Sequence, residues 1–200
     1  MEEPLVLLMP FPAQGHIKPM LCLAQLLCHA GIHVTFLNTE HIHLQFTNRH
    51  AISAHFPSLR FESIPDGLPE NHPRIRQNNP ELIVSLTSVT KPLFKQLLVS
   101  SLEETTTAGG GSNVINCVIA DCVLPFAIDV AQELGIPVIE FRTTSACYLW
   151  TTSFCIPKLL EEGQLPFKDN DDLDQPVTGV VGTEGVVPST GLTGLLQGAT

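Results

Sequence analysis

The stretch LVLLMPFPAQGHIKPMLCLAQLLCHAG, residues 5–31, decides the fold. Its first five residues are wholly apolar, which is typical of a strand covered on both faces of a sheet. From Ile17 onward apolar residues recur at helical spacing, and Gly31 is well placed to end that helix. Because proline fits best in the first turn of a helix, Pro19 places the predicted helix start close to His16. The stretch predicts a strand and a helix with a histidine at their junction.

The rest of the chain repeats this alternation of strand and helix. Short apolar runs predict further strands at residues 32–37, 59–65, 114–120 and 138–141. Helical patterns are predicted at residues 79–100, with a kink at Pro92, at 125–134 and at 145–160. Such alternation predicts an α/β fold with a doubly wound parallel sheet. If the chain winds outward and then returns, the strand order is 3-2-1-4-5.

Two titratable residues fall at the carboxyl ends of strands that this order makes neighbours. His16 follows the first strand closely, and Asp121 directly follows the fourth. Ligands of doubly wound folds bind where two such strands diverge. A neutral imidazole can take a proton from a hydroxyl when a carboxylate holds its other nitrogen. The pair therefore predicts a general base with its orienting carboxylate. In the alternative reading, His16 caps a helix and Asp121 merely ends a strand.

The charge balance argues against two classes of partner. Ten basic residues stand against twenty acidic ones, a net charge of −10. Because no basic cluster is available to neutralise phosphates, neither nucleic acid nor an anionic membrane is expected as a partner. The N-terminus has an acidic start and an apolar run broken by Pro10 and Pro12, which fits neither a signal peptide nor a membrane span. A cytoplasmic location is expected.

Cysteine and histidine spacing give no metal or disulfide signature. The six cysteines form no C-x-x-C pair and mostly lie in apolar runs, so buried reduced thiols are expected. The tightest histidine pair, His41 and His43, lacks the accompanying spacing of a zinc site. No G-x-G-x-x-G follows the first strand, which argues against a dinucleotide cofactor. No metal and no resident cofactor are expected.

Three ordered segments closely resemble the plant UDP-dependent glycosyltransferases of family 1. They are MPFPAQGHIKPMLCLAQLLCHAGIHVTFLNTEHIH (9–43), FESIPDGLP (61–69) and CVIADCVLPFAIDVAQELGIPVIEFRTTSACYLW (117–150). The resemblance covers residues 5 to about 185. It implies a GT-B architecture of two Rossmann-like domains, with the acceptor bound mainly by the N-terminal one.

The resemblance also implies roles for single residues. His16 would be the catalytic base and Asp121 its orienting carboxylate, with Gln14 and Gly15 binding substrate. Thr143 would lie close to the donor sugar, although a local cap at the strand end is an equal alternative. The family usually carries an aromatic residue at the position of Arg142.

Two functions follow as expectations. In the first, a UDP-sugar is the co-substrate, and its sugar, expected to be glucose, passes with inversion to a hydroxyl or carboxyl of a small lipophilic acceptor. In the second, the chain is a truncated, non-catalytic fragment that binds an acceptor or a partner chain.

The resemblance also predicts a division of the chain. Residues 1–185 are expected to form the acceptor-binding Rossmann-like domain, and residues 186–200 an atypical tail. The family's C-terminal donor-binding domain is not found in this sequence. Self-association through the surface left uncovered is therefore expected.

Overall fold

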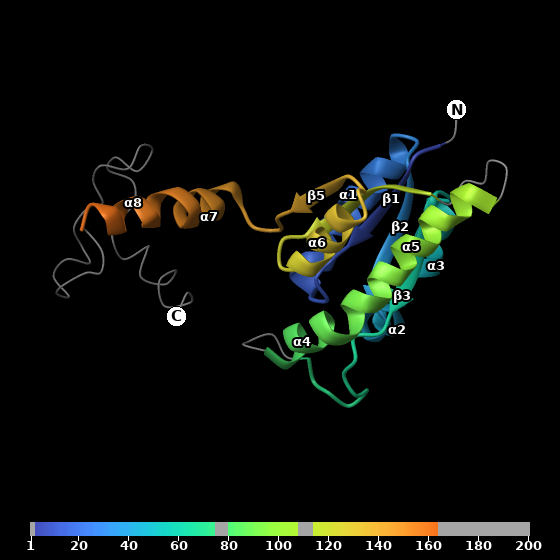
Figure 1. Cartoon of the computed structure of the whole chain (residues 1–200), viewed down its shortest axis with the longest axis horizontal. Coiled ribbons are helices and arrows are strands. Elements are labelled where there is room, and N and C mark those ends of the chain that lie inside the picture. Colours follow the sequence, from blue (N-terminus) through green and yellow to red (C-terminus); the bar gives the residue numbers. More distant parts are fainter. Residues whose placement is uncertain (1–2, 75–79, 108–113, 164–200) are drawn as a thin grey trace. The chain divides into compact units, whose positions relative to one another are not determined.

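The structure, a computed structural model, describes residues 3–74, 80–107 and 114–163. It divides into two compact units, Met1–Thr143 and Thr144–Thr200, and each is described by itself (Figure 1). The first unit contains the sheet, and the described part of the second is helical.

Five parallel strands form the sheet in the order β3-β2-β1-β4-β5 (Figure 1). The strands are β1 (Leu5–Met9), β2 (His33–Thr39), β3 (Leu59–Ile64), β4 (Ile115–Asp121) and β5 (Val138–Phe141). Both the predicted strand order and the α/β class are confirmed. The carboxyl ends of β1 and β4 therefore lie side by side, as the chemistry predicted for His16 and Asp121 requires.

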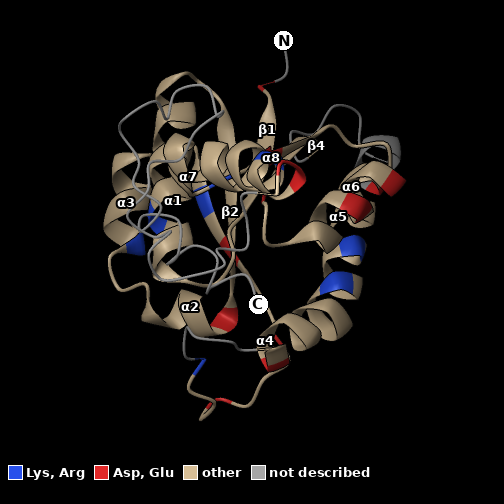
Figure 2. Ribbon diagram, turned by 90° about the vertical axis from the view of Figure 1, so that its left-hand side faces the viewer, with Lys and Arg blue, Asp and Glu red and all other residues tan. Residues whose placement is uncertain are grey.

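Alternate residues of the central strand face two separate cores. Val6 and Leu8 of β1 pack with α1 (Gln14–His29) on one face of the sheet. Leu5 and Leu7 face the other way, toward α5 (Lys91–Thr107) and α6 (Pro125–Glu133). Lys95 and Glu133 join these two helices by an ion pair of 2.6 Å, and Figure 2 shows charged residues on both helices. Burial on both faces explains why β1 is continuously apolar.

Helix α1 begins directly after the loop that leaves β1. Ala13 is its N-cap, and Gly31, with φ of +79°, follows its end, as the sequence predicts. The prediction that Pro19 lies in the first turn is wrong, because α1 begins at Gln14 and places Pro19 in the second turn. Proline has no N–H, so the carbonyl of Gly15 cannot accept the usual helical bond from position 19.

The long helix predicted after the third strand is interrupted as expected. It consists of α4 (Pro80–Ser85), the π-helical segment η1 (Leu86–Thr90) and α5. The irregularity lies just before Pro92, whose missing N–H breaks the helical ladder. The helix continues to Thr107 rather than ending near residue 100.

By length and composition alone, the span Pro80–Glu103 could cross a membrane. Its residues Leu86, Phe94 and Leu98 are buried in the core, whereas Ile83 and Val84 are exposed. The absence of a membrane partner stays a prediction, as does the cytoplasmic location.

Two short helices between β2 and β3 were not predicted. They are α2 (Glu40–Gln45) and α3 (Arg49–His55). The side chain of Thr39 accepts a hydrogen bond from the Ile42 N–H at 3.5 Å and so caps α2. That threonine was the available signal, but the histidine-rich segment after it lacks an apolar period.

In the second unit, the helix predicted at residues 145–160 is present. It runs through α7 (Ala146–Trp150), the π-helical segment η2 (Thr151–Cys155) and α8 (Ile156–Glu161), and Ser145 caps it. The domain end predicted at residue 185 and the tail at 186–200 lie outside the described residues, so both stay predictions.

All six cysteines are free thiols, but the prediction that they are buried is wrong for most of them. Cys155 is buried, whereas Cys22 and Cys147 are exposed and the other three are half-buried. Apolar neighbours in the sequence did not indicate burial here. Adjacent residues of a helix or a strand point to different sides of the element, so a cysteine can be exposed beside buried neighbours.

Candidate functional site

The structure brings His16 and Asp121 into direct contact although 105 positions separate them. Asp121 is the last residue of β4, and His16 lies in the first turn of α1, just beyond the neighbouring strand β1. The His16 Nδ1 atom lies 2.8 Å from Asp121 Oδ2. The Asp121 side chain is fully buried, whereas 24% of the His16 side chain is exposed. The histidine is therefore within reach of a ligand, and the carboxylate is not.

Further hydrogen bonds hold the Asp121 carboxylate. The Val123 N–H donates to Oδ1 at 3.1 Å, and the Phe11 N–H donates to Oδ2 at 3.4 Å. Burial raises the pKa of Asp121, but the bond with His16 and these backbone bonds outweigh it and leave the pKa below 3.8. An ionised carboxylate can only accept, so the Nδ1–H of His16 donates to it. The lone pair of Nε2 is then free to take a proton.

Thr143 joins this pair from the end of a third strand. It follows β5, and its Oγ1 atom lies 3.1 Å from His16 Nδ1. Because Nδ1 carries a hydrogen, the threonine oxygen is a second acceptor beside the carboxylate. The predicted proximity of Thr143 to a donor sugar stays a prediction, as do the roles predicted for the other site residues.

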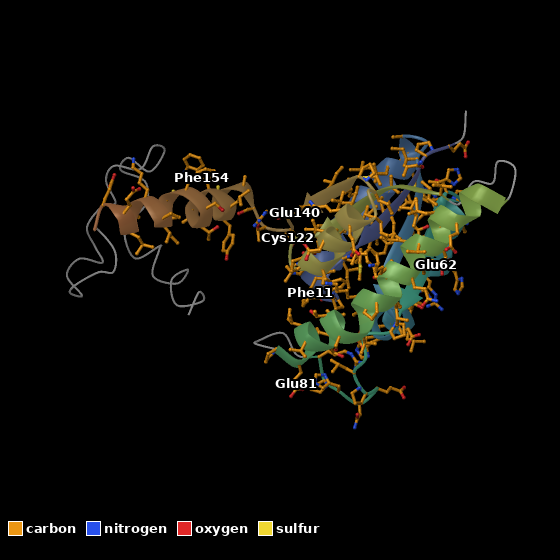
Figure 3. All side chains as sticks on the ribbon, in the orientation of Figure 1. Phe11, Glu62, Glu81, Cys122, Glu140 and Phe154 are labelled. Atoms are coloured by element: carbon orange, nitrogen blue, oxygen red, sulfur yellow. The ribbon has the colours of Figure 1, made fainter. Side chains whose placement is uncertain are left out.

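Phe11 belongs to the site, and the sequence reading missed it. Its ring packs edge-on against His16 with centroids 5.3 Å apart, while its N–H contacts Asp121. Its place between β1 and α1 was the available signal. Figure 3 shows Phe11, Cys122 and Glu140 near one end of the sheet. There Glu140 pairs with Arg142 at 2.8 Å, and both side chains are about half exposed.

A cavity of about 1610 Å³ lies beside this site. Its lining includes Gln14 and Gly15, both predicted to bind substrate, and Phe11, whose ring contacts His16. His16 is not among the described residues that line the cavity. The remaining wall comes from α1, α2, α4 and the loop after β3, and includes Ile17, Ile42, Phe46, Pro73, Arg74, Leu82 and Ile83. Most of these side chains are apolar, which suits a lipophilic ligand.

No cluster of three or more histidine, cysteine or acidic side chains that could hold a metal ion occurs among the described residues. What the site offers is a partly exposed histidine bonded to a buried carboxylate, beside an apolar cavity.

No protein-family model matches the chain, but single proteins do. Mogroside I-A1 synthase of Siraitia grosvenorii is 47% identical over 194 residues, which are 97% of this chain and 35% of that protein. A 7-deoxyloganetic acid glucosyltransferase of Catharanthus roseus is 44% identical over 184 residues, which are 90% of this chain and 37% of that protein. The chain thus spans little more than a third of the length of these relatives.

A solved structure agrees with these relatives. UDP-glucose: anthocyanidin 3-O-glucosyltransferase in complex with UDP superposes with a TM-score of 0.59 and 26% identity. The match covers 86% of this chain and 36% of that one. The chain therefore belongs to the plant UDP-dependent glycosyltransferases and corresponds to their N-terminal part.

Proposed function

We propose that this chain forms the acceptor-binding part of a transferase that moves a sugar from a UDP-sugar to a small lipophilic acceptor. His16 is the general base of the reaction. The observation that carries the proposal is the hydrogen bond of 2.8 Å between His16 and the buried carboxylate of Asp121, beside a large apolar cavity.

The reaction needs one proton transfer and one displacement. The acceptor hydroxyl gives its proton to Nε2 of His16 while its oxygen attacks the anomeric carbon of the sugar. The bond from that carbon to the diphosphate oxygen breaks, and UDP leaves with the electron pair. Attack from the face opposite the leaving group inverts the anomeric configuration. Asp121 stabilises the imidazolium that forms, as the carboxylate of a catalytic triad does. A carboxyl acceptor that is already ionised needs no base.

The lining of the cavity supports a lipophilic acceptor. Apolar side chains such as Ile17, Ile42 and Phe46 line it, and its volume exceeds the roughly 300–1,000 Å³ of common ligand pockets. The names of the two relatives refer to a mogroside and to a carboxylic acid, which supports lipophilic acceptors with a hydroxyl or carboxyl group. The names of the second relative and of the solved structure support glucose as the sugar.

The small share of the relatives' length that this chain spans favours a second function. Because the chain spans 35% and 37% of their lengths, residues 1–200 by themselves could bind an acceptor without transferring a sugar to it. Precise orientation of both reactants contributes about 7–11 kcal/mol of barrier lowering, and it requires a donor held as firmly as the acceptor.

One experiment tests both functions. The chain alone, and the chain joined to the donor-binding part of the Siraitia relative, are incubated with UDP-glucose and a panel of phenols and terpenoid acids. Glucosides are measured by mass spectrometry. We expect transfer by the joined protein and none by the chain alone. Robust turnover by the chain alone would contradict the second function.

A single substitution then tests the base. In the joined protein, His16→Ala is expected to lower transfer to hydroxyl acceptors by about 10²–10⁴-fold, the usual contribution of general-base catalysis. The matched control is His29→Ala, at the other end of the same helix, where the ring packs on Phe56. If His16→Ala stays within twofold of wild type, the base assignment is wrong.

A further inference from the structure

The loop after β3, residues 65–74, is organised by a buried ion pair. Arg74 Nε donates to Asp66 Oδ2 at 2.8 Å, and Arg74 Nη2 donates to Asp66 Oδ1 at 3.0 Å. The two side chains are only 8% and 5% exposed. This is the two-point geometry in which arginine binds a carboxylate most strongly.

The same guanidinium also closes the loop on itself. Its remaining donors reach the carbonyl oxygens of Leu68, Pro69 and His72, each at 3.0 Å. All five N–H donors of Arg74 therefore have an acceptor. Arg74 also has a φ of +49°, a left-handed backbone that an arginine rarely adopts. Such strain persists only where the surrounding contacts outweigh it.

The loop is joined in turn to the helix that follows it. The Ser85 hydroxyl donates to the carbonyl of Asp66 at 2.7 Å, and the Thr90 hydroxyl donates to the carbonyl of Pro65 at 2.8 Å. Gly67 packs so closely against this helix that a Cβ there would lie 2.5 Å from Ser85 Oγ. The loop, α4 and η1 thus form one assembly.

This assembly supplies part of the cavity wall. Pro73 and Arg74 contribute from the loop, and Leu82 and Ile83 contribute from α4. The start of α1, next to His16, supplies another part. Helix α2 and the residues after it supply a third part. The position of an acceptor relative to the base thus depends on several structures, and the ion pair holds one of them.

We propose that the Asp66–Arg74 ion pair positions the acceptor by holding the wall formed by the loop and α4. Neither residue takes part in the chemistry: Asp66 and Arg74 are positioning residues for affinity and selectivity. A wall fixed in advance lowers the ordering cost of binding. Burial raises the pKa of Asp66, but the bonds from Arg74 and from the Leu68 N–H outweigh it, so the carboxylate stays charged at neutral pH. This inference rests on the proposed function, since it assumes that the cavity binds the acceptor.

The test compares Asp66→Asn with wild type in two experiments. In the full chain, hydrogen exchange is followed with and without quercetin as the probe. In wild type, quercetin is expected to slow exchange both in α4 and at the start of α1. In Asp66→Asn, the slowing is expected to be lost in α4 and kept at α1. In the joined transferase, the acceptor KM is expected to rise at least fivefold, with kcat within twofold of wild type.

Two control variants separate positioning from general destabilisation. Leu98→Ala opens a cavity in the core below α5 and lowers the melting temperature, but it removes none of the hydrogen bonds that organise the loop. A second contact joins the same loop to α4: His72 Nε2 lies 3.0 Å from Oε2 of the more exposed Glu81. Glu81→Gln removes the negative charge from this contact. Both are expected to keep the protection by quercetin in α4 and the wild-type KM.

The outcomes distinguish the inference from the proposed function. If wild type binds quercetin and transfers sugar but Asp66→Asn keeps its KM and its protection in α4, the positioning role is overturned. The same holds if Leu98→Ala raises KM as much as Asp66→Asn does. If wild type neither binds any compound of the panel nor transfers sugar, the proposed function is overturned, and the inference falls with it.

Discussion

Asp121 and Asp66 are both buried aspartates beyond or at the carboxyl end of a strand, yet their partners differ in kind. Asp121 holds a histidine that is partly exposed and whose second ring nitrogen is not bonded to the carboxylate. Asp66 holds an arginine whose charge is permanent and whose donors are all used within the protein. In both, hydrogen bonds outweigh burial and lower the pKa. The roles proposed for the two sites, proton transfer at one and structural support at the other, therefore differ because of the partner and not because of the carboxylate.

The largest expected effect is on turnover, through Asp121→Asn. An asparagine keeps the volume but removes the charge, so it no longer fixes the His16 tautomer or stabilises the imidazolium. In the joined transferase we expect kcat to fall by about 10²–10⁴-fold, with acceptor affinity little changed. The melting temperature of the variant is measured as well. If activity and the folded structure are lost together, Asp121 has a structural role instead. Asp66→Asn is expected to show the opposite pattern, with KM and stability affected and kcat kept.

Gly67→Ala sharpens the structural side of this comparison. Gly67 has φ of +79°, and an added Cβ would lie 2.5 Å from Ser85 Oγ and 2.6 Å from Val89 Cγ2. We expect a loss of stability of about 1–3 kcal/mol in urea unfolding, from backbone strain and crowding together. Gly135→Ala is the matched control, because its φ is +70° but nothing lies within 4 Å of the added Cβ. An equal loss in both variants would mean that Gly67 does not pack tightly against the helix.

Acid unfolding tests whether both carboxylates are charged and bound in the folded state. Because their pKa values lie below 3.8 when folded, their stabilisation is complete above pH 3.8 and is lost as the pH falls through the folded values. Unfolding monitored by circular dichroism should therefore show stability falling below pH 3.8, less steeply in Asp66→Asn and Asp121→Asn. A pH profile unchanged in both variants would contradict this assignment.

His41 adds a second contribution to the pH dependence of stability, at higher pH than the two carboxylates. Burial and the nearby Arg74 charge lower its pKa below 6.5, so the folded state binds its proton less readily than the unfolded state. Stability should therefore also decline as the pH falls below 6.5, and His41→Gln should remove that part of the decline.

The smallest expected effect concerns Asn38, a buried amide that belongs to neither pair. Its side-chain nitrogen and oxygen have no hydrogen-bond partner among the described residues, and the residue is 2% exposed. Replacing an unpaired buried amide by an apolar side chain of similar shape can be neutral or stabilising. We expect Asn38→Leu to raise the free energy of unfolding by up to about 1 kcal/mol. A clear loss of stability would show that the amide is bonded in solution.

The sequence by itself determined the sheet and the meeting of His16 with Asp121. Short apolar runs separated by helical patterns predict parallel strands, and the handedness of their connections restricts the strand order. Once β1 and β4 are neighbours, residues that follow their carboxyl ends must lie close together. His16 and Asp121 could therefore be paired without any knowledge of side-chain geometry.

The tertiary structure alone decided the rest of the site. Nothing in the pattern DGLPENHPR indicated that Arg74 would bend back onto Asp66, because a left-handed backbone at an arginine has no sequence signal. The contact of Thr143 with His16 likewise depends on the rotamers that packing selects. Periodicity reports which face of an element is buried, whereas the partner of a buried polar group depends on which donors and acceptors the folded chain brings within about 3 Å.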